Sequence, residues 1–144
     1  MNKNFAALLG WMLAAVLALT GCAPAPTEPG EAAESEPRVD VVNAYTAREG
    51  DSALERGTVI LESVTWDAAA GTLTFSGSLP TPCQELRIDS SQSGRELAFT
   101  VYSLSQPDML CAQVLEPFEA ILELKNFSAD AFSVKVNDEI VDLQ

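Results

Sequence analysis

Histidine is absent from this 144-residue sequence, which limits the chemistry that its side chains can run. Histidine is the usual general base near neutral pH and the commonest metal ligand, so a Ser-His-Asp arrangement is excluded and zinc or copper sites are not expected. The 21 acidic residues could supply a carboxylate pair for hydrolysis, as in glycosidases, although so many acids form pairs by chance. We expect a protein that is not an enzyme and holds no cofactor, with a carboxylate-based hydrolase as the weakest alternative.

Calcium is the metal that the remaining ligand types suit best. Asp89-Ser90-Ser91 and Asn137-Asp138-Glu139 offer oxygen ligands on segments that we interpret as turns. Neither segment has the spacing of a known calcium loop, and Asn and Asp favour turns for conformational reasons alone. The sequence therefore predicts no metal site.

Cys22 is the first of three cysteines, and the chain before it has the character of an export signal. Lys3 precedes an uncharged run from Phe5 to Thr20, which is shorter than the roughly 20 residues of a spanning helix. Leu19-Thr20-Gly21-Cys22 resembles the lipobox of bacterial lipoproteins. The resemblance implies cleavage before Cys22, a diacylglyceryl group on its thiol and a further acyl chain such as palmitate on the new N-terminus. Several chains are needed because a single one binds membranes only marginally.

This resemblance also predicts where the protein works. A lipoprotein lies in the cell envelope, on the extracytoplasmic side of a membrane, and Ala23 in place of Asp favours the outer membrane in a cell that has two. Removal of Lys3 with the signal leaves 7 basic and 21 acidic residues, a formal charge of −14. Nucleic acid is therefore not an expected partner, because its binding depends on Lys and Arg contacts. An envelope protein or a cell-wall component is the expected partner class.

Cys83 and Cys111 remain once Cys22 is committed to lipid. Disulfides form and persist outside the cytoplasm, so we predict a structural bond between them. The alternative is a redox-active pair, but the sequence lacks the Cys-x-x-Cys spacing that lowers a thiol pKa.

Composition divides the chain into four parts. Residues 1–21 are the expected signal peptide, and residues 22–38 are an acidic, proline-rich segment that we expect to be a disordered tether. Residues 39–56 are ambiguous between a short strand and a loop. Residues 57–144 are the expected folded domain.

From residue 57 onward, apolar and polar residues alternate with the period of a β-strand. In Thr72–Leu79 the apolar side chains occupy odd positions and the hydroxyls even ones, which predicts one buried face. Val59–Trp66 has mixed phase, which indicates a bulge or a central strand. Further strands are expected near residues 86–88, 97–101, 120–124, 132–136 and 140–141, the last two joined by a turn at Asn137 and Asp138. About seven strands without an amphipathic helix predict an all-β, antiparallel, immunoglobulin-like sandwich with one disulfide.

The strand period alone does not place two aromatic residues of this sandwich. Trp66 is expected in the core, as large aromatics usually are. Tyr102 is out of phase with Leu97, Phe99 and Val101, so its ring belongs either on the outer face or in the core.

Residues 75–137 also resemble uncharacterised β-sandwich domains of bacterial envelope proteins. The resemblance rests on Gly77-Ser78-Leu79-Pro80-Thr81-Pro82-Cys83, on Cys111 to Glu119 with its Cys-x-x-x-Leu-x-Pro-Phe-Glu pattern, and on Val134-Lys135-Val136-Asn137. It implies a disulfide-linked sandwich at the cell surface. Many relatives place Gly-Thr-Tyr before the last strand, where this chain has Ala129 to Phe132. The resemblance implies no activity and no catalytic residue.

The first functional hypothesis is a membrane-anchored, non-enzymatic binding or structural module of the cell envelope. The second is an inhibitor or accessory subunit of an envelope hydrolase. A binding function would use the polar strand faces and the loop tips, and the second hypothesis would present two turn-rich loops that the expected disulfide brings side by side. The candidate binding residues are Pro80, Thr81 and Pro82 in one loop and Gln106, Pro107 and Asp108 in the other.

Overall fold

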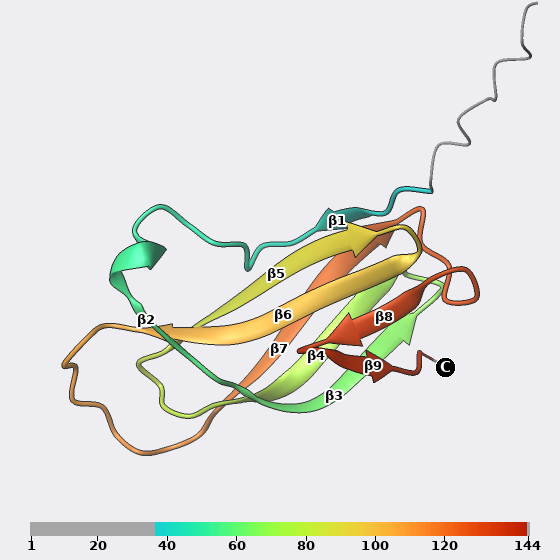
Figure 1. The fold of residues 1–144 in the computed structure, drawn as a ribbon. Coiled ribbons are helices and arrows are strands. Elements are labelled where there is room, and N and C mark those ends of the chain that lie inside the picture. Colours follow the sequence, from blue (N-terminus) through green and yellow to red (C-terminus); the bar gives the residue numbers. More distant parts are fainter. Residues whose placement is uncertain (1–36, 144) are drawn as a thin grey trace, which may run out of the picture. The chain divides into compact units, whose positions relative to one another are not determined.

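The computed structural model describes residues 37–143. The expected signal peptide, the lipid site at Cys22 and all but the end of the expected tether lie outside the described residues. Within them the chain forms nine strands and one short 3₁₀ helix (Figure 1). Their bounds are β1 Asp40–Val42, η1 Asp51–Ala53, β2 Glu55–Gly57, β3 Ile60–Asp67, β4 Thr72–Leu79, β5 Glu85–Ser93, β6 Glu96–Ser105, β7 Glu116–Lys125, β8 Ser133–Val136 and β9 Glu139–Val141.

The strands form two sheets. The first has the order β1-β7-β4-β3. In the second, β5 pairs along one side of β6, while β2 and β8 pair with its other side at opposite ends, and β9 pairs with β8. The expected all-β sandwich is confirmed, as are the strands predicted after residue 57. One detail differs from a purely antiparallel sandwich, because β6 and β8 run parallel.

The apolar faces of the two sheets pack on each other, as the two-residue period requires. Leu73 and Phe75 of β4 are fully buried, and so is Phe99 of β6. The rings of Phe75 and Phe99 meet edge to face across the sheets, with centroids 5.4 Å apart. Ala120, Leu122 and Leu124 of β7 complete the central layer of the core from the first sheet.

Residues 39–56, which the sequence left open between strand and loop, contain both. Val41 of β1 pairs with Leu124 of β7 in the first sheet, and Arg56 of β2 pairs with Leu104 of β6 in the second. Between them the Tyr45 carbonyl accepts a hydrogen bond from the Ile88 N–H of β5 at 2.9 Å. This segment therefore belongs to the sandwich and connects its two sheets.

Two irregular features of the sheets, a bulge and a turn, lie where the sequence predicts them. The β3–β4 register shifts between Leu61 and Ser63, which confirms the bulge expected from the mixed phase, although β3 is an edge strand and not a central one. Asn137 and Asp138 join β8 to β9, and both have positive φ. Positive φ at both central residues is what a two-residue type I′ hairpin turn requires. The Asn137 side-chain oxygen also accepts the Val101 N–H at 2.8 Å, which fixes the end of β8 against β6.

The two uncertain aromatics take different places. Trp66 is partly buried against the core and meets Phe127 edge to face, with centroids 4.7 Å apart. Tyr102 stands on the outer face of the second sheet, since Val101 points into the core, and yet it is buried. The guanidinium of Arg56 covers its ring, 3.6 Å from the centroid.

Candidate binding surface at the linked loops

Two loops leave the same end of the sandwich and carry all six candidate binding residues. The first, residues 80–84, connects β4 to β5, and the second, residues 106–115, connects β6 to β7. Each begins with a turn: the Thr81 carbonyl accepts the Gln84 N–H at 3.3 Å, and the Gln106 carbonyl accepts the Met109 N–H at 3.4 Å. Asp108 adopts a positive φ of 60°, a conformation that Asp tolerates better than most residues. We call these segments the linked loops.

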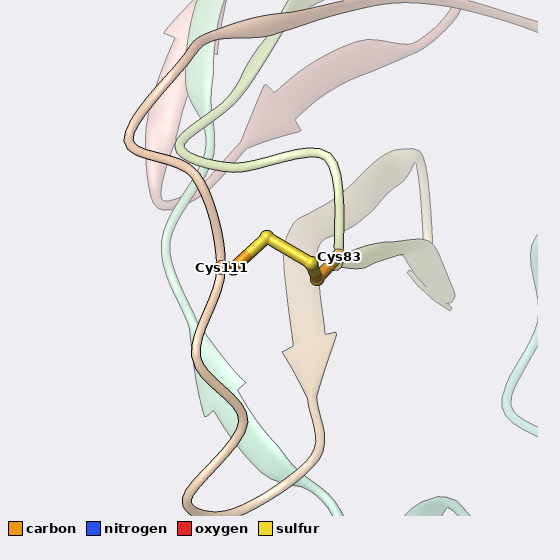
Figure 2. Close-up of a disulfide and its surroundings, with 2 residues drawn as sticks. All are labelled: Cys83 and Cys111. Carbon is orange, nitrogen blue, oxygen red and sulfur yellow. A yellow bond between two sulfur atoms is a disulfide. The ribbon is translucent and has the colours of Figure 1, made fainter.

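The disulfide between Cys83 and Cys111 joins them (Figure 2). The two Cα atoms lie 6.1 Å apart and the bond closes a sequence separation of 28 residues. The predicted bond is therefore confirmed, and it brings together loops that follow different strands. In the entropy model it stabilises the fold by about 3–4 kcal/mol, and it limits the movement of residues 106–115.

The candidate residues themselves divide into exposed and covered positions. Pro82, Gln106, Pro107 and Asp108 are exposed, whereas Pro80 is half-buried and Thr81 is buried. Thr81 is therefore a covered part of the first loop, where its carbonyl closes the turn with Gln84, and it offers little surface to a partner. The second loop presents most of the accessible candidate positions.

The largest feature of this surface was not among the sequence candidates. Four large apolar side chains of the second loop are exposed: Leu110 at 99%, Val114 at 62%, Leu115 at 55% and Met109 at 46%. Single exposed apolar residues are ordinary, but a concentration of them on one loop is typical of an interaction site. We call these four residues the apolar set. Met109 and Leu110 directly follow the Pro107-Asp108 turn, so apolar residues between turn signals could have identified them.

Acidic groups alone border the apolar set along the chain. The sequence has no Lys or Arg between Arg95 and Lys125, and Asp108 and Glu116 lie at the two ends of the exposed stretch. Glu55 of β2 lies near its base, since it pairs with Ser105, the last residue of β6. All three acidic residues are exposed. Arg56, the residue after Glu55, is also exposed, and its guanidinium lies over the Tyr102 ring. The border that the second loop itself forms is therefore negative.

A second cluster of charged groups lies on the outer face of the second sheet, around Arg87. Its Nε donates to one carboxylate oxygen of Asp51 at 2.7 Å and its Nη2 to the other at 3.0 Å. Nη2 also donates to Glu85 at 2.8 Å. The bond from Arg87, with a second from the Arg48 backbone N–H, lowers the pKa of Asp51 to about 2. These carboxylates are engaged by a buried arginine, so the cluster fixes η1 on the sheet and offers no acid–base pair.

Tyr102 belongs to the same face. Burial raises the pKa of its phenol, and the nearby carboxylate of Asp89 raises it further. The expectation that Asp89-Ser90-Ser91 forms a turn is wrong, because all three residues lie within β5. Among residues 37–143 no three His, Cys, Asp or Glu side chains gather in a way that could hold a metal ion.

A groove of about 600 Å³ lies where the described chain begins. Residues 38–41 and 90–92 form most of its lining. Gln92 holds the entering chain there: its side-chain oxygen accepts the Val39 N–H at 2.9 Å and its amide donates to the Pro37 carbonyl at 2.6 Å. Arg38 and Asp40 of the entering chain are themselves part of the lining, so we interpret the groove as the place where residues 37–41 are held against β5.

Gln92 pairs with Leu97 near the start of β6, whereas the linked loops adjoin the start of β5 and the end of β6. The point of chain entry and the apolar set therefore lie at opposite ends of the β5–β6 hairpin (Figure 1). Residues 85–92 span about 25 Å at the rise of an extended strand. No helix in the described part of the chain is long and apolar enough to cross a membrane.

Comparison with known proteins identifies the family that this part of the chain resembles. Residues 73–143 match the ORF11 beta-sandwich domain. The match to the ORF11 beta-sandwich domain begins within β4 and includes both linked loops, so β1, η1, β2 and β3 precede it. Searches of curated proteins and of solved structures found no significant match.

Proposed function

We propose that this chain is a bacterial lipoprotein, acylated at Cys22 and held on the extracytoplasmic side of a membrane. The support is the Leu19-Thr20-Gly21-Cys22 segment after a short apolar run. The disulfide of the sandwich agrees with an oxidising compartment. If the cell has two membranes, the outer one is favoured, because residue 23 is Ala.

Metabolic labelling with radioactive palmitate tests the anchor. The wild-type protein should incorporate label and sediment with membranes, and Cys22→Ser should lose the label and be recovered uncleaved or soluble. Cys83→Ala combined with Cys111→Ala is the matched control, because it removes two cysteines and should retain the label. Equal labelling of wild type and Cys22→Ser would refute the lipid attachment.

We further propose that the anchored domain is a non-enzymatic binding module for a component of the cell envelope. The observation that carries this proposal is the apolar set, and above all Leu110, whose side chain is 99% exposed. A leucine that touches almost nothing in the free protein contributes little to its folding. The disulfide restrains the loop that carries it, so less entropy would be lost when a partner binds.

Site-specific photo-cross-linking in living cells tests the binding surface. Gln113 is exposed within the second loop, so a photoreactive side chain at this position should join the protein to one envelope component. Leu110→Ser in the same background should reduce the yield at least tenfold. Ile140→Ser is the matched control, because Ile140 is 75% exposed on β9 and lies outside the linked loops. Equal loss in both variants, or no product at all, would contradict the proposal.

One observation favours a second function, an inhibitor or accessory subunit of an envelope hydrolase. Leu110 is directly followed by Cys111, whose bond to Cys83 ties the exposed backbone to the first of the linked loops. A restrained loop with a protruding apolar side chain has the geometry needed to enter a substrate cleft. Purified protein should then slow turnover by an envelope protease or muramidase, and Leu110→Ser should relieve the inhibition.

A further inference from the structure

We infer that the apolar set docks into an apolar cleft of an envelope protein whose rim carries lysine or arginine. This inference deepens the proposed binding function and rests on it. It adds the chemistry of the partner, which the border of the surface specifies.

The charge around the apolar set is the first argument. Asp108 and Glu116 are exposed at its two ends, and Glu55 is exposed near its base. None of the three forms a salt bridge within the part of the chain that the structure describes. A partner that covered Leu110 would bring its own rim against these carboxylates. Basic groups there would be attracted, whereas acidic groups would be repelled.

The anchoring membrane does not fit this surface. The chain enters the domain at Gln92, and the apolar set lies at the other end of the β5–β6 hairpin. The strands separate these two points by about 25 Å, so chain entry does not itself place the apolar set against the membrane. Anionic headgroups would also face Asp108 and Glu116, and the mature chain has a formal charge of −14.

A second copy of the chain fits no better. Symmetric contact through the apolar set would bring the Asp108 and Glu116 carboxylates of two copies to one interface. The second loop itself has no Lys or Arg to offset that repulsion, since none lies between residues 95 and 125. Like charges at an interface oppose association, so a basic-rimmed protein cleft is the occupant that the surface matches.

The arrangement assigns separate tasks to the two kinds of residue. Burial of Leu110 and its apolar neighbours would provide most of the affinity, because the hydrophobic effect scales with area. The exposed carboxylates would mainly accelerate encounter, and this contribution weakens as salt shortens the range of the charges. Cross-linking should therefore depend on salt as well as on Leu110.

The test uses the full-length acylated protein in isolated envelopes, with the photoreactive side chain at Gln113. Asp108→Asn combined with Glu116→Gln should lower the yield of the protein–protein product at least about threefold at 50 mM NaCl. The same loss should occur in the wild type when NaCl is raised to about 500 mM, and the double variant should respond little to salt. Asp130→Asn combined with Glu139→Gln is the matched control, because both positions are exposed turn or strand residues away from the linked loops. Peptide mapping of the product should place Lys or Arg within the partner sequence that borders the cross-link.

Three results would overturn the inference. They are a cross-link to lipid, a cross-link to a second copy, and a protein product whose yield changes neither with salt nor in the Asp108→Asn, Glu116→Gln double variant. The last result would refute the claim that the partner has a basic rim. The proposed binding function would still stand, provided that Leu110→Ser abolished the product. Loss of every product would instead remove the proposed function together with the inference.

Discussion

Gly77 shows how a single residue without a side chain permits two strands to approach. It lies in β4 opposite the bulge of β3, and a Cβ at this position would collide with the carbonyl oxygen of Ile60. The same Cβ would come within 3.0 Å of the Phe118 ring from β7. Its role is a matter of space, since its backbone is that of an ordinary strand.

We predict that Gly77→Ala destabilises the domain by about 1–3 kcal/mol, because backbone atoms must move to admit the methyl group. Urea unfolding followed by tryptophan fluorescence measures the change. Ser63→Ala, an exposed substitution in the neighbouring strand, should remain within about 0.5 kcal/mol of wild type. A Gly77→Ala midpoint equal to that of Ser63→Ala would show that the strands adjust freely.

Asp51 gives a second prediction at the residue scale, in the dependence of stability on pH. Its pKa is lowered from 3.8 to about 2 by the hydrogen bonds from Arg87 and from the Arg48 backbone. A carboxyl with a depressed folded pKa stabilises the fold above its unfolded pKa and loses that contribution as pH falls through the folded value.

Asp51→Asn should therefore unfold at a lower temperature than wild type at pH 6, and the difference should shrink as pH falls from 3.8 to about 2. Thermal unfolding by circular dichroism across this range measures both. Asp130→Asn, at an exposed turn, is the control. A difference that stays constant down to pH 2 would mean that the Arg87 bonds do not stabilise the ionised form of Asp51.

At the scale of elements, the strands that the sequence revealed are those with a clear two-residue period. Thr72–Leu79 matches β4 in its whole length, because one of its faces lies on the core. The sequence pattern does not separate β1 and β2 from loop, because each has only three residues. Each is held by a partner far along the chain, β7 for β1 and β6 for β2. The sequence predicts a turn at Asp89 to Ser91 from a residue type that favours turns, yet these residues pair with residues 98–100 of β6.

The disulfide joins two connections that belong to different strand pairs. Its loss through Cys83→Ala and Cys111→Ala together should lower the free energy of unfolding by about 3–4 kcal/mol, the entropy of a closed loop of this length. Chemical denaturation measures the change, and amide exchange should increase in residues 106–115. A loss below about 1 kcal/mol would indicate that the two loops hold together without the bond.

At the scale of the whole molecule, the sandwich could be predicted, but only part of its binding surface could. The turn residues and the cysteines predicted that two loops meet, and that prediction is confirmed. The exposure of Met109, Leu110, Val114 and Leu115 could not be read from their types, because in a β-rich chain such residues usually face the core. Which apolar residues remain outside depends on how both sheets close, and that information is spread over the entire chain.

The central claim is that the apolar set serves a partner and not the fold. The most direct measurement combines thermal unfolding with photo-cross-linking from Gln113 for Leu110→Ser and Ile140→Ser. We predict unfolding temperatures within about 2 °C of wild type for both variants, because neither side chain is packed, together with loss of the cross-link in Leu110→Ser alone. A lower unfolding temperature for Leu110→Ser with an unchanged cross-link yield would contradict the claim and make Leu110 a structural residue.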